Sequence, residues 1–208
     1  MKQLNETLKE QIKQAIRTAE ERSSCEFVAV ITQKSGDYRI YAFFFSALVA
    51  LIVPHLLLWL GDWFTIGFVF RLQIALFVIL LIVTHLAKLN NWLTPGGVKK
   101  RQAALVAAES FRKFGLHRTA SRRAVLFFVS IDEGYVEIIA DVGIEAKIPS
   151  DTWRPVIEKL RHRLSAKNVG QGYLEAIEAC GAILMREFPA EEGDVDELPN
   201  ELIIDTPN

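Results

Sequence analysis

Two long apolar runs interrupt a chain whose flanks alternate between apolar and polar positions. They extend over residues 42–60 and 64–87, and only Ser46, Pro54 and His55 interrupt the first of them. About 20 residues at about 1.5 Å per residue cross the roughly 30 Å hydrocarbon core of a bilayer as a helix. The runs therefore predict a transmembrane helical hairpin within residues 39–90, with its spans at 42–60 and 64–87.

The alternative is a pair of helices buried in a soluble core. The rest of a 208-residue chain is too short to cover two helices that are apolar on all sides, so we favour the membrane. Gly61, Asp62 and Trp63 form the predicted turn, and Trp59 and Trp92 join Trp63 where an aromatic belt is expected.

Basic residues near the ends of the spans predict the orientation. The flanks carry all of them, whereas the connecting turn has Asp62 and neither Lys nor Arg; they are Lys34, Arg39, Lys88, Lys99, Lys100 and Arg101. By the positive-inside rule both flanks are cytoplasmic. Residues 1–21 are polar and do not resemble a secretory signal. We expect a two-span membrane protein with a cytoplasmic soluble domain.

The flanks predict an α/β domain that the hairpin divides. Residues 5–22 have helical spacing and precede a strand at 25–32; this pair forms the N-terminal part of the domain, residues 1–38. The remainder, residues 91–189, predicts the order helix, strand, strand, helix, helix. Because the first strand has no partner in its own flank, it must pair with the later strands. Residues 190–208 form an acidic, extended tail whose Leu198, Leu202, Ile203 and Ile204 could dock on the domain.

Composition narrows the class of partner. The formal net charge of −1 gives no basis for nucleic-acid binding. Cys25 and Cys180 fall at apolar positions without metal or redox spacing, which is typical of reduced, buried thiols.

A series of short segments resembles a known family. These segments are Glu26-Phe-Val-Ala-Val30, Phe114-Gly-Leu-His-Arg-Thr119, Val125-Leu-Phe-Phe-Val-Ser130, Ile138-Ile-Ala-Asp-Val-Gly-Ile144, Trp153, Gly170-Gln-Gly172, Phe188-Pro189 and Asp196-Glu-Leu-Pro-Asn200. In this order they resemble the TPM-domain family, which includes thylakoid-lumen phosphatase-like and photosystem-repair proteins and bacterial membrane-anchored members. The resemblance implies helices on both faces of a small mixed sheet. It also implies either acid phosphatase or divalent-cation binding, or an accessory role in assembly or repair of membrane complexes.

Asp141 is the first candidate ligand residue. It matches the family's loop, as Gly143 does, and it ends an apolar strand, where α/β sheets commonly bind ligands. With Glu145 and Asp132 it could hold a divalent cation such as calcium. The alternative is a capping residue, with Gly143 supplying a left-handed bend. Many relatives have an acidic residue or Asn-Gly where this chain has Ser121-Arg-Arg-Ala124, which disfavours a cation there.

A basic cluster is the second candidate site, and it comprises His117, Arg118, Arg122 and Arg123. Guanidinium groups match phosphate oxygens, so the cluster could bind phosphate or anionic lipid headgroups. It could equally be a solvated loop or a dock for the chain's own acidic tail.

Signatures of catalysis are few. Residues 96–100 lack the spacing of a nucleotide-phosphate loop. Asp194-Val-Asp196 has the form of a phosphoryl acceptor but does not follow a strand. We therefore favour a non-enzymatic binding or accessory factor, with a divalent-metal-assisted phosphatase that uses Asp141 as the alternative. The expected partners are the lipid bilayer, a membrane or cytoplasmic protein, and a further copy of the chain through Ser46 and Ala50.

Overall fold

The computed structural model describes residues 6–59, 65–87, 89–166, 168–191, 197–198 and 202–205. The chain divides into two compact units, residues 36–99 and the remainder on either side of them. The predicted turn at residues 61–63 lies outside the described residues. So does most of the acidic tail, with its Asp194-Val-Asp196 segment.

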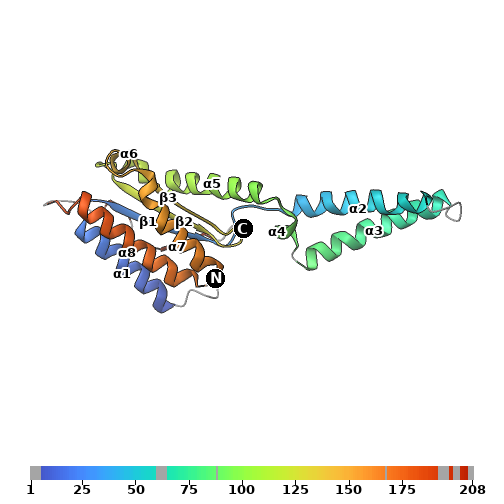
Figure 1. Cartoon of the computed structure of the whole chain (residues 1–208), viewed down its shortest axis with the longest axis horizontal. Coiled ribbons are helices and arrows are strands. Elements are labelled where there is room, and N and C mark those ends of the chain that lie inside the picture. Colours follow the sequence, from blue (N-terminus) through green and yellow to red (C-terminus); the bar gives the residue numbers. More distant parts are fainter. Residues whose placement is uncertain are drawn as a thin grey trace. The chain divides into compact units, whose positions relative to one another are not determined.

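The described residues of the larger unit form one four-stranded mixed sheet (Figure 1). Its strands are β1 (Glu26–Thr32), β2 (Ala124–Ser130), β3 (Tyr135–Ala140) and β4 (Leu202–Asp205), in the spatial order β3-β2-β1-β4. Strand β1 runs parallel to both β2 and β4, whereas β2 and β3 are antiparallel. This confirms the predicted mixed α/β fold. The tail contributes more than docking side chains, because Leu202 to Asp205 extend the sheet beside β1.

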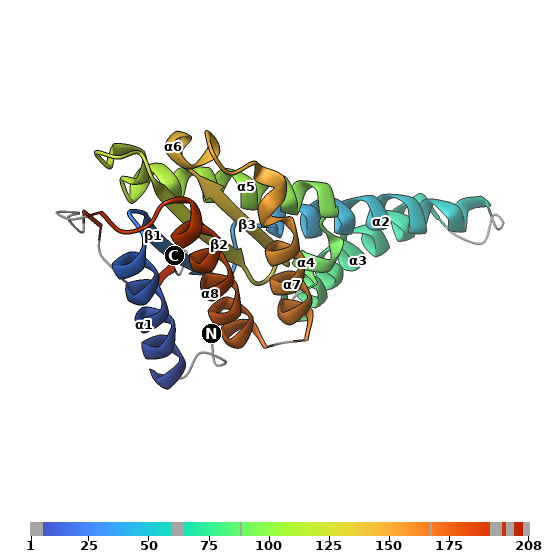
Figure 2. The same cartoon turned by 60° about the vertical axis from the view of Figure 1, so that its left-hand side comes forward.

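Helices cover both faces of this sheet. On one face α1 (Glu6–Arg22), α8 (Val169–Glu187) and α7 (Arg154–Ser165) lie side by side in that order (Figure 2). On the other face lies α5 (Gly96–Lys113). Alternate side chains of β1 enter the two cores: Phe27 and Ile31 face α1 and α8, while Val28 faces α5. Burial on both faces explains why β1 and β2 are almost continuously apolar.

Tyr173 of α8 lies fully buried against the middle of the sheet. Its hydroxyl donates to the carbonyl oxygen of Phe127 at 2.7 Å. The ring of Phe127 stacks on that of Phe27, with centroids 5.9 Å apart. The strand pair β1–β2 and helix α8 are thus joined at one point by packing and by a hydrogen bond.

Close packing of α8 depends on two glycines. A Cβ atom at Gly172 would lie 2.5 Å from the Cβ of Arg163 on α7. A Cβ atom at Gly181 would lie 3.1 Å from the Cβ of Ala19 on α1. The absence of side chains at these two positions therefore sets how closely the three helices approach one another.

The smaller unit contains α2 (Arg39–Trp59), α3 (Ile66–Leu86) and the short α4 (Asn90–Leu93). Helices α2 and α3 pack on each other, and Ala42, Ser46 and Ala50 of α2 are buried. Pro54 lies inside α2 without ending it. Most other large apolar side chains point outward; Phe44 is 63% exposed and Trp59 is 92% exposed. By length and composition both helices could cross a membrane.

Candidate functional site

The strand directions separate the candidate acidic residues. Asp141 follows β3, and its backbone N–H donates to the carbonyl of Ala124, the first residue of β2, at 2.9 Å. Asp132 lies two residues beyond the end of β2 and therefore at the opposite end of the sheet. In α/β sheets, ligands collect at the carboxyl ends of the parallel strands. Because β3 is antiparallel, Asp141 lies at the amino ends of β1 and β2, and that rule does not apply to it.

The Asp141 carboxylate is buried, and both of its oxygens accept hydrogen bonds. Arg122 donates to it twice, from Nε to Oδ2 at 2.6 Å and from Nη2 to Oδ1 at 2.9 Å. The backbone N–H of Val142 donates to Oδ1 at 2.8 Å, so Asp141 caps the short helix α6 (Val142–Glu145). Asp141 is 4% exposed, whereas the Arg122 side chain is 46% exposed. The geometry is that of the capping alternative.

These contacts set the charge state of Asp141. Burial alone would raise the pKa of Asp141. The hydrogen bonds from Arg122 and from the Val142 N–H, together with the charges of Arg122 and His117, outweigh burial and hold the pKa below its ordinary value. The carboxylate is therefore ionised and paired at neutral pH, and its oxygens are shared among three N–H donors.

The loop around this pair is tightly fitted. Arg122 has a φ of 55°, in the left-handed region. Gly143 donates its N–H to the Arg122 carbonyl at 3.0 Å, and a Cβ atom at Gly143 would lie 2.6 Å from that oxygen. The expectation that Gly143 supplies a left-handed bend was wrong, because among the described glycines a positive φ occurs at Gly115 and Gly134. Gly143 is needed for close backbone approach instead.

The predicted set of cation ligands is not brought together. Glu145 is exposed one helical turn after Asp141, while Asp132 accepts a hydrogen bond from Gln33 at the other end of the sheet. Among the residues that the structure describes, no three His, Cys, Asp or Glu side chains are grouped so that they could hold a metal ion.

Two residues of the basic cluster pair with the chain's own carboxylates. Arg123 donates from Nη1 to Glu191 and to Ser24, both at 2.8 Å, and its guanidinium lies 5.3 Å from the Phe188 ring centroid. Glu197 accepts from the backbone N–H of Ala120 at 3.0 Å. With Arg122 bound to Asp141, two of the four predicted residues hold carboxylates. His117 lies in the 3-10 turn η1 (Leu116–Arg118), and Arg118 is exposed. The geometry favours the tail-docking alternative.

Sequence reasoning missed a hydroxyl network at the carboxyl ends of β1 and β2. Ser130 donates its hydroxyl to Glu133, Ser35 donates to Ser130 Oγ at 2.8 Å, and the Ser35 N–H donates to Glu133 at 2.9 Å. A cavity of about 210 Å³ lies at this end, lined by Thr32, Lys34, Ser35, Val106, Glu109, Ser110 and Lys113. The available signal was that Ser130 ends one apolar strand and that Ser35 follows the other closely. The contact between Ser35 and Ser130, which are 95 residues apart, could not be predicted from local sequence.

Glu137 provides a pH-dependent test of the sheet. It lies half-buried on edge strand β3 and accepts the Tyr135 hydroxyl at 3.0 Å. Burial raises the pKa of Glu137, although the Tyr135 hydrogen bond opposes this. Because the pKa is higher in the folded state than in the unfolded state, the stability gained from protonation is complete below the unfolded pKa and is lost as pH rises through the folded pKa.

Glu137→Gln keeps the acceptor and removes the charge, so it should raise the melting temperature at pH 7.5 by about 2 °C, on the order of 0.5–1 kcal/mol. It should have little effect near pH 4. Thermal unfolding followed by circular dichroism at the two pH values measures this difference. An equal effect at both would show that the charge of Glu137 is not the cause.

Comparison with known proteins places this architecture in a class of mixed α/β domains. Over 97% of this chain and 95% of its own, the NMR structure of the BA42 protein from the psychrophilic bacterium Bizionia argentinensis shares the fold, with a TM-score of 0.61 and 19% sequence identity. Residues 92–183 match the model of the TPM domain. This segment is therefore similar to a TPM domain, in agreement with the resemblance read from the sequence. No curated protein sequence matches the chain significantly.

Proposed function

We propose that this chain is a TPM-domain protein that is anchored in a membrane by α2 and α3 and acts there as a non-enzymatic binding or accessory factor at the cytoplasmic face. The observation that carries the proposal is the outward-facing apolar surface of the two helices. Along α2 and α3, large side chains such as Phe44, Leu48, Phe70 and Ile74 are each more than half exposed. Soluble monomers rarely expose contiguous apolar patches larger than a few hundred Å².

Two polar side chains within these helices lie at hydrogen-bond distance from backbone carbonyls of their own helix, which suits a lipid environment. The Thr84 hydroxyl donates to the Leu80 carbonyl at 2.8 Å, and His55 Nδ1 lies at hydrogen-bond distance, 2.7 Å, from the Leu51 carbonyl. Helical backbone groups bond within the helix, which hydrocarbon requires. Burying each large apolar side chain in lipid favours insertion by about 1.5–3 kcal/mol.

The engagement of Asp141 supports a binding role over the phosphatase alternative. A metal-assisted phosphatase that used Asp141 would need its carboxylate oxygens for a cation. Those oxygens already accept from Arg122 and Val142, and the helix that Asp141 caps would lose its cap if they turned away. Recruiting Asp141 would therefore cost stability at the edge of the sheet.

Cysteine labelling in intact cells tests the anchoring and the orientation together. Cys25 and Cys180 are buried, and burial raises the pKa of the Cys180 thiol, so both should react slowly. We expect Lys13→Cys, at an exposed position of α1, to react with a membrane-impermeant maleimide only after permeabilisation. Asp62→Cys, in the connection between the spans, should react in intact cells.

The two positions serve as controls for each other. Labelling of Lys13→Cys in intact cells would overturn the cytoplasmic placement of the domain. Protection of both cysteines in intact cells, with both exposed after permeabilisation, would overturn the crossing of the membrane.

A further inference from the structure

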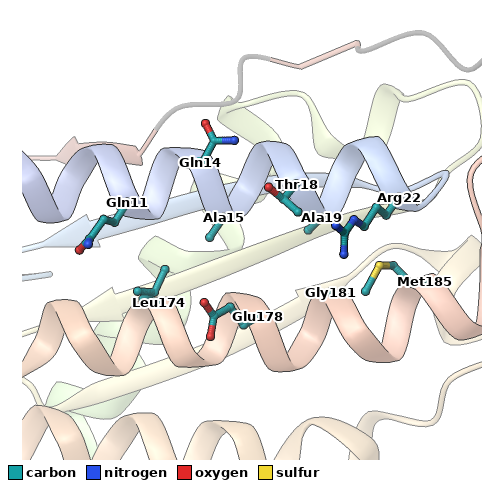
Figure 3. Close-up of a pocket in the computed structure, with 10 residues that line it drawn as sticks. All are labelled: Gln11, Gln14, Ala15, Thr18, Ala19, Arg22, Leu174, Glu178, Gly181 and Met185. Carbon is teal, nitrogen blue, oxygen red and sulfur yellow. The ribbon is translucent and has the colours of Figure 1, made fainter.

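A groove of about 500 Å³ opens between α1 and α8 (Figure 3). Its lining comes from these two helices alone: Gln11, Gln14, Ala15, Thr18, Ala19 and Arg22 of α1, and Leu174, Glu178, Gly181 and Met185 of α8. In Figure 3 the side chain of Arg22 extends from α1 toward α8, and that of Glu178 lies along α8 between Leu174 and Gly181. The groove is separate from Asp141 and from the hydroxyl network.

The lining residues repeat with the spacing of a helix-packing surface. On α1, positions 11, 15, 18 and 22 follow steps of four, three and four; on α8, positions 174, 178, 181 and 185 follow the same steps. This is the spacing by which a helix presents one stripe to a neighbouring helix in a coiled coil. Both stripes span three turns, about 16 Å. Two such stripes side by side form a surface on which a third helix can pack.

Small residues allow a third helix to approach closely. Ala15, Ala19 and Gly181 line the groove, and Gly181 packs directly on Ala19. Leu174 and Met185 add half-buried apolar surface at its two ends. Methionine adapts to irregular neighbours, as in other helix-binding grooves.

Two charged side chains in the groove determine which charges the bound helix must carry. Within the described part of the chain, the side chains of Arg22 and Glu178 form no ion pair or hydrogen bond, and each lines the groove. Arg22 lies three residues beyond Ala19 and Glu178 three residues before Gly181, so they are separated by about 9 Å along the helix axes. That separation corresponds to about two turns of a helix laid in the groove.

The direction of the bound helix follows from the two helices that form the groove. In Figure 3, residue numbers increase in the same direction along α1 and α8, and the residues just after them, Ser23 and Pro189, form a bridge. A third helix that runs antiparallel to both is favoured, because antiparallel helix dipoles attract each other. It would then place an acidic residue near its N-terminus against Arg22 and a basic residue two turns later against Glu178, which its own dipole also favours.

We propose that this groove binds an amphipathic helix of a protein partner. The helix runs antiparallel to α1 and α8, carries Glu or Asp near its N-terminus and Lys or Arg seven residues later, and has Ala or Leu between them on the same face. The inference rests on the proposed role as a binding factor and identifies the surface and the partner class. It does not depend on the orientation in the membrane.

A peptide titration with the full-length protein in lipid nanodiscs tests the proposal. The probe is a fluorescent helical peptide of about 16 residues with Glu at position 3, Lys at position 10 and Leu and Ala on the same face. The matched control peptide has these two charges exchanged. We expect the probe to bind at least about tenfold more tightly, with the preference reversed in the double variant Arg22→Glu, Glu178→Lys. Lys13→Glu, on an exposed position of α1 outside the groove lining, should leave both affinities unchanged.

A second variant separates shape from charge. Ala15→Leu places bulk in the groove and should weaken both peptides without changing the circular dichroism spectrum. Equal binding of the two peptides, absence of saturable binding, or an unreversed preference in the double variant would overturn the proposal. If the chain instead forms a dimer and Arg22→Glu abolishes this dimer, the groove binds a second copy of the chain and the proposal is overturned. None of these outcomes bears on the cysteine labelling, so failure of the groove and failure of the anchor are distinguishable.

Discussion

Tyr173→Ala is expected to lower the free energy of unfolding of the domain by about 4 kcal/mol, the typical cost of truncating a buried aromatic residue. Tyr173 has no exposed surface and lies in the core between α8 and strands β1 and β2. Its removal leaves a cavity beside the stacked rings of Phe27 and Phe127 and frees the Phe127 carbonyl of its side-chain donor. Because typical domains are stable by about 5–15 kcal/mol, this is a large fraction of the total.

Tyr173→Phe separates the two contributions. It preserves the ring and removes the hydroxyl, so it should cost about 1 kcal/mol, the usual net value of a hydrogen bond. Urea unfolding of the two variants and the wild type, followed by circular dichroism in detergent, measures the difference. A loss below about 1 kcal/mol for Tyr173→Ala would contradict the role of this residue in joining α8 to the sheet.

Local pattern was sufficient to predict most of the fold. The continuous apolar character of residues 124–130 predicts a central strand, and the structure places β2 there, buried on both faces. The requirement that the first strand find partners beyond the insertion is met by the parallel pairing of Glu26 to Thr32 with Ala124 to Ser130. Strand β4 was missed because four residues in an acidic, Pro-bearing segment have no periodicity of their own. Their extended structure depends on pairing with β1.

The candidate sites were less accessible to sequence reasoning, because their partners are distant in the chain. Asp141 and Arg122 were both identified, but as parts of separate sites; their pairing depends on the β2–β3 hairpin bringing the two loops together. The Ser35–Ser130 contact and the α1–α8 groove depend on the packing of segments that are about 95 and 160 residues apart. Sequence periodicity identifies which face of an element is buried, not which element covers it.

The second large effect is expected from removing the hairpin. Residues 36–99 form their own compact unit, inserted between β1 and the part of α5 that packs on the sheet. Parallel strands need a crossover connection, and the remainder of α5 can provide it once a short Gly/Ser linker joins Ser35 to Lys100. We expect this deletion variant to fold as a soluble domain that retains the circular dichroism signal of its helices and strands.

Partition of the full-length chain and the deletion variant after alkaline carbonate extraction tests the central claim most directly, since this treatment releases peripheral proteins from membranes. We predict that the full-length protein stays in the membrane pellet until detergent is added. The variant without residues 36–99 should appear, folded, in the supernatant. Recovery of the full-length protein as a detergent-free monomer in the supernatant would contradict the claim that lipid surrounds α2 and α3.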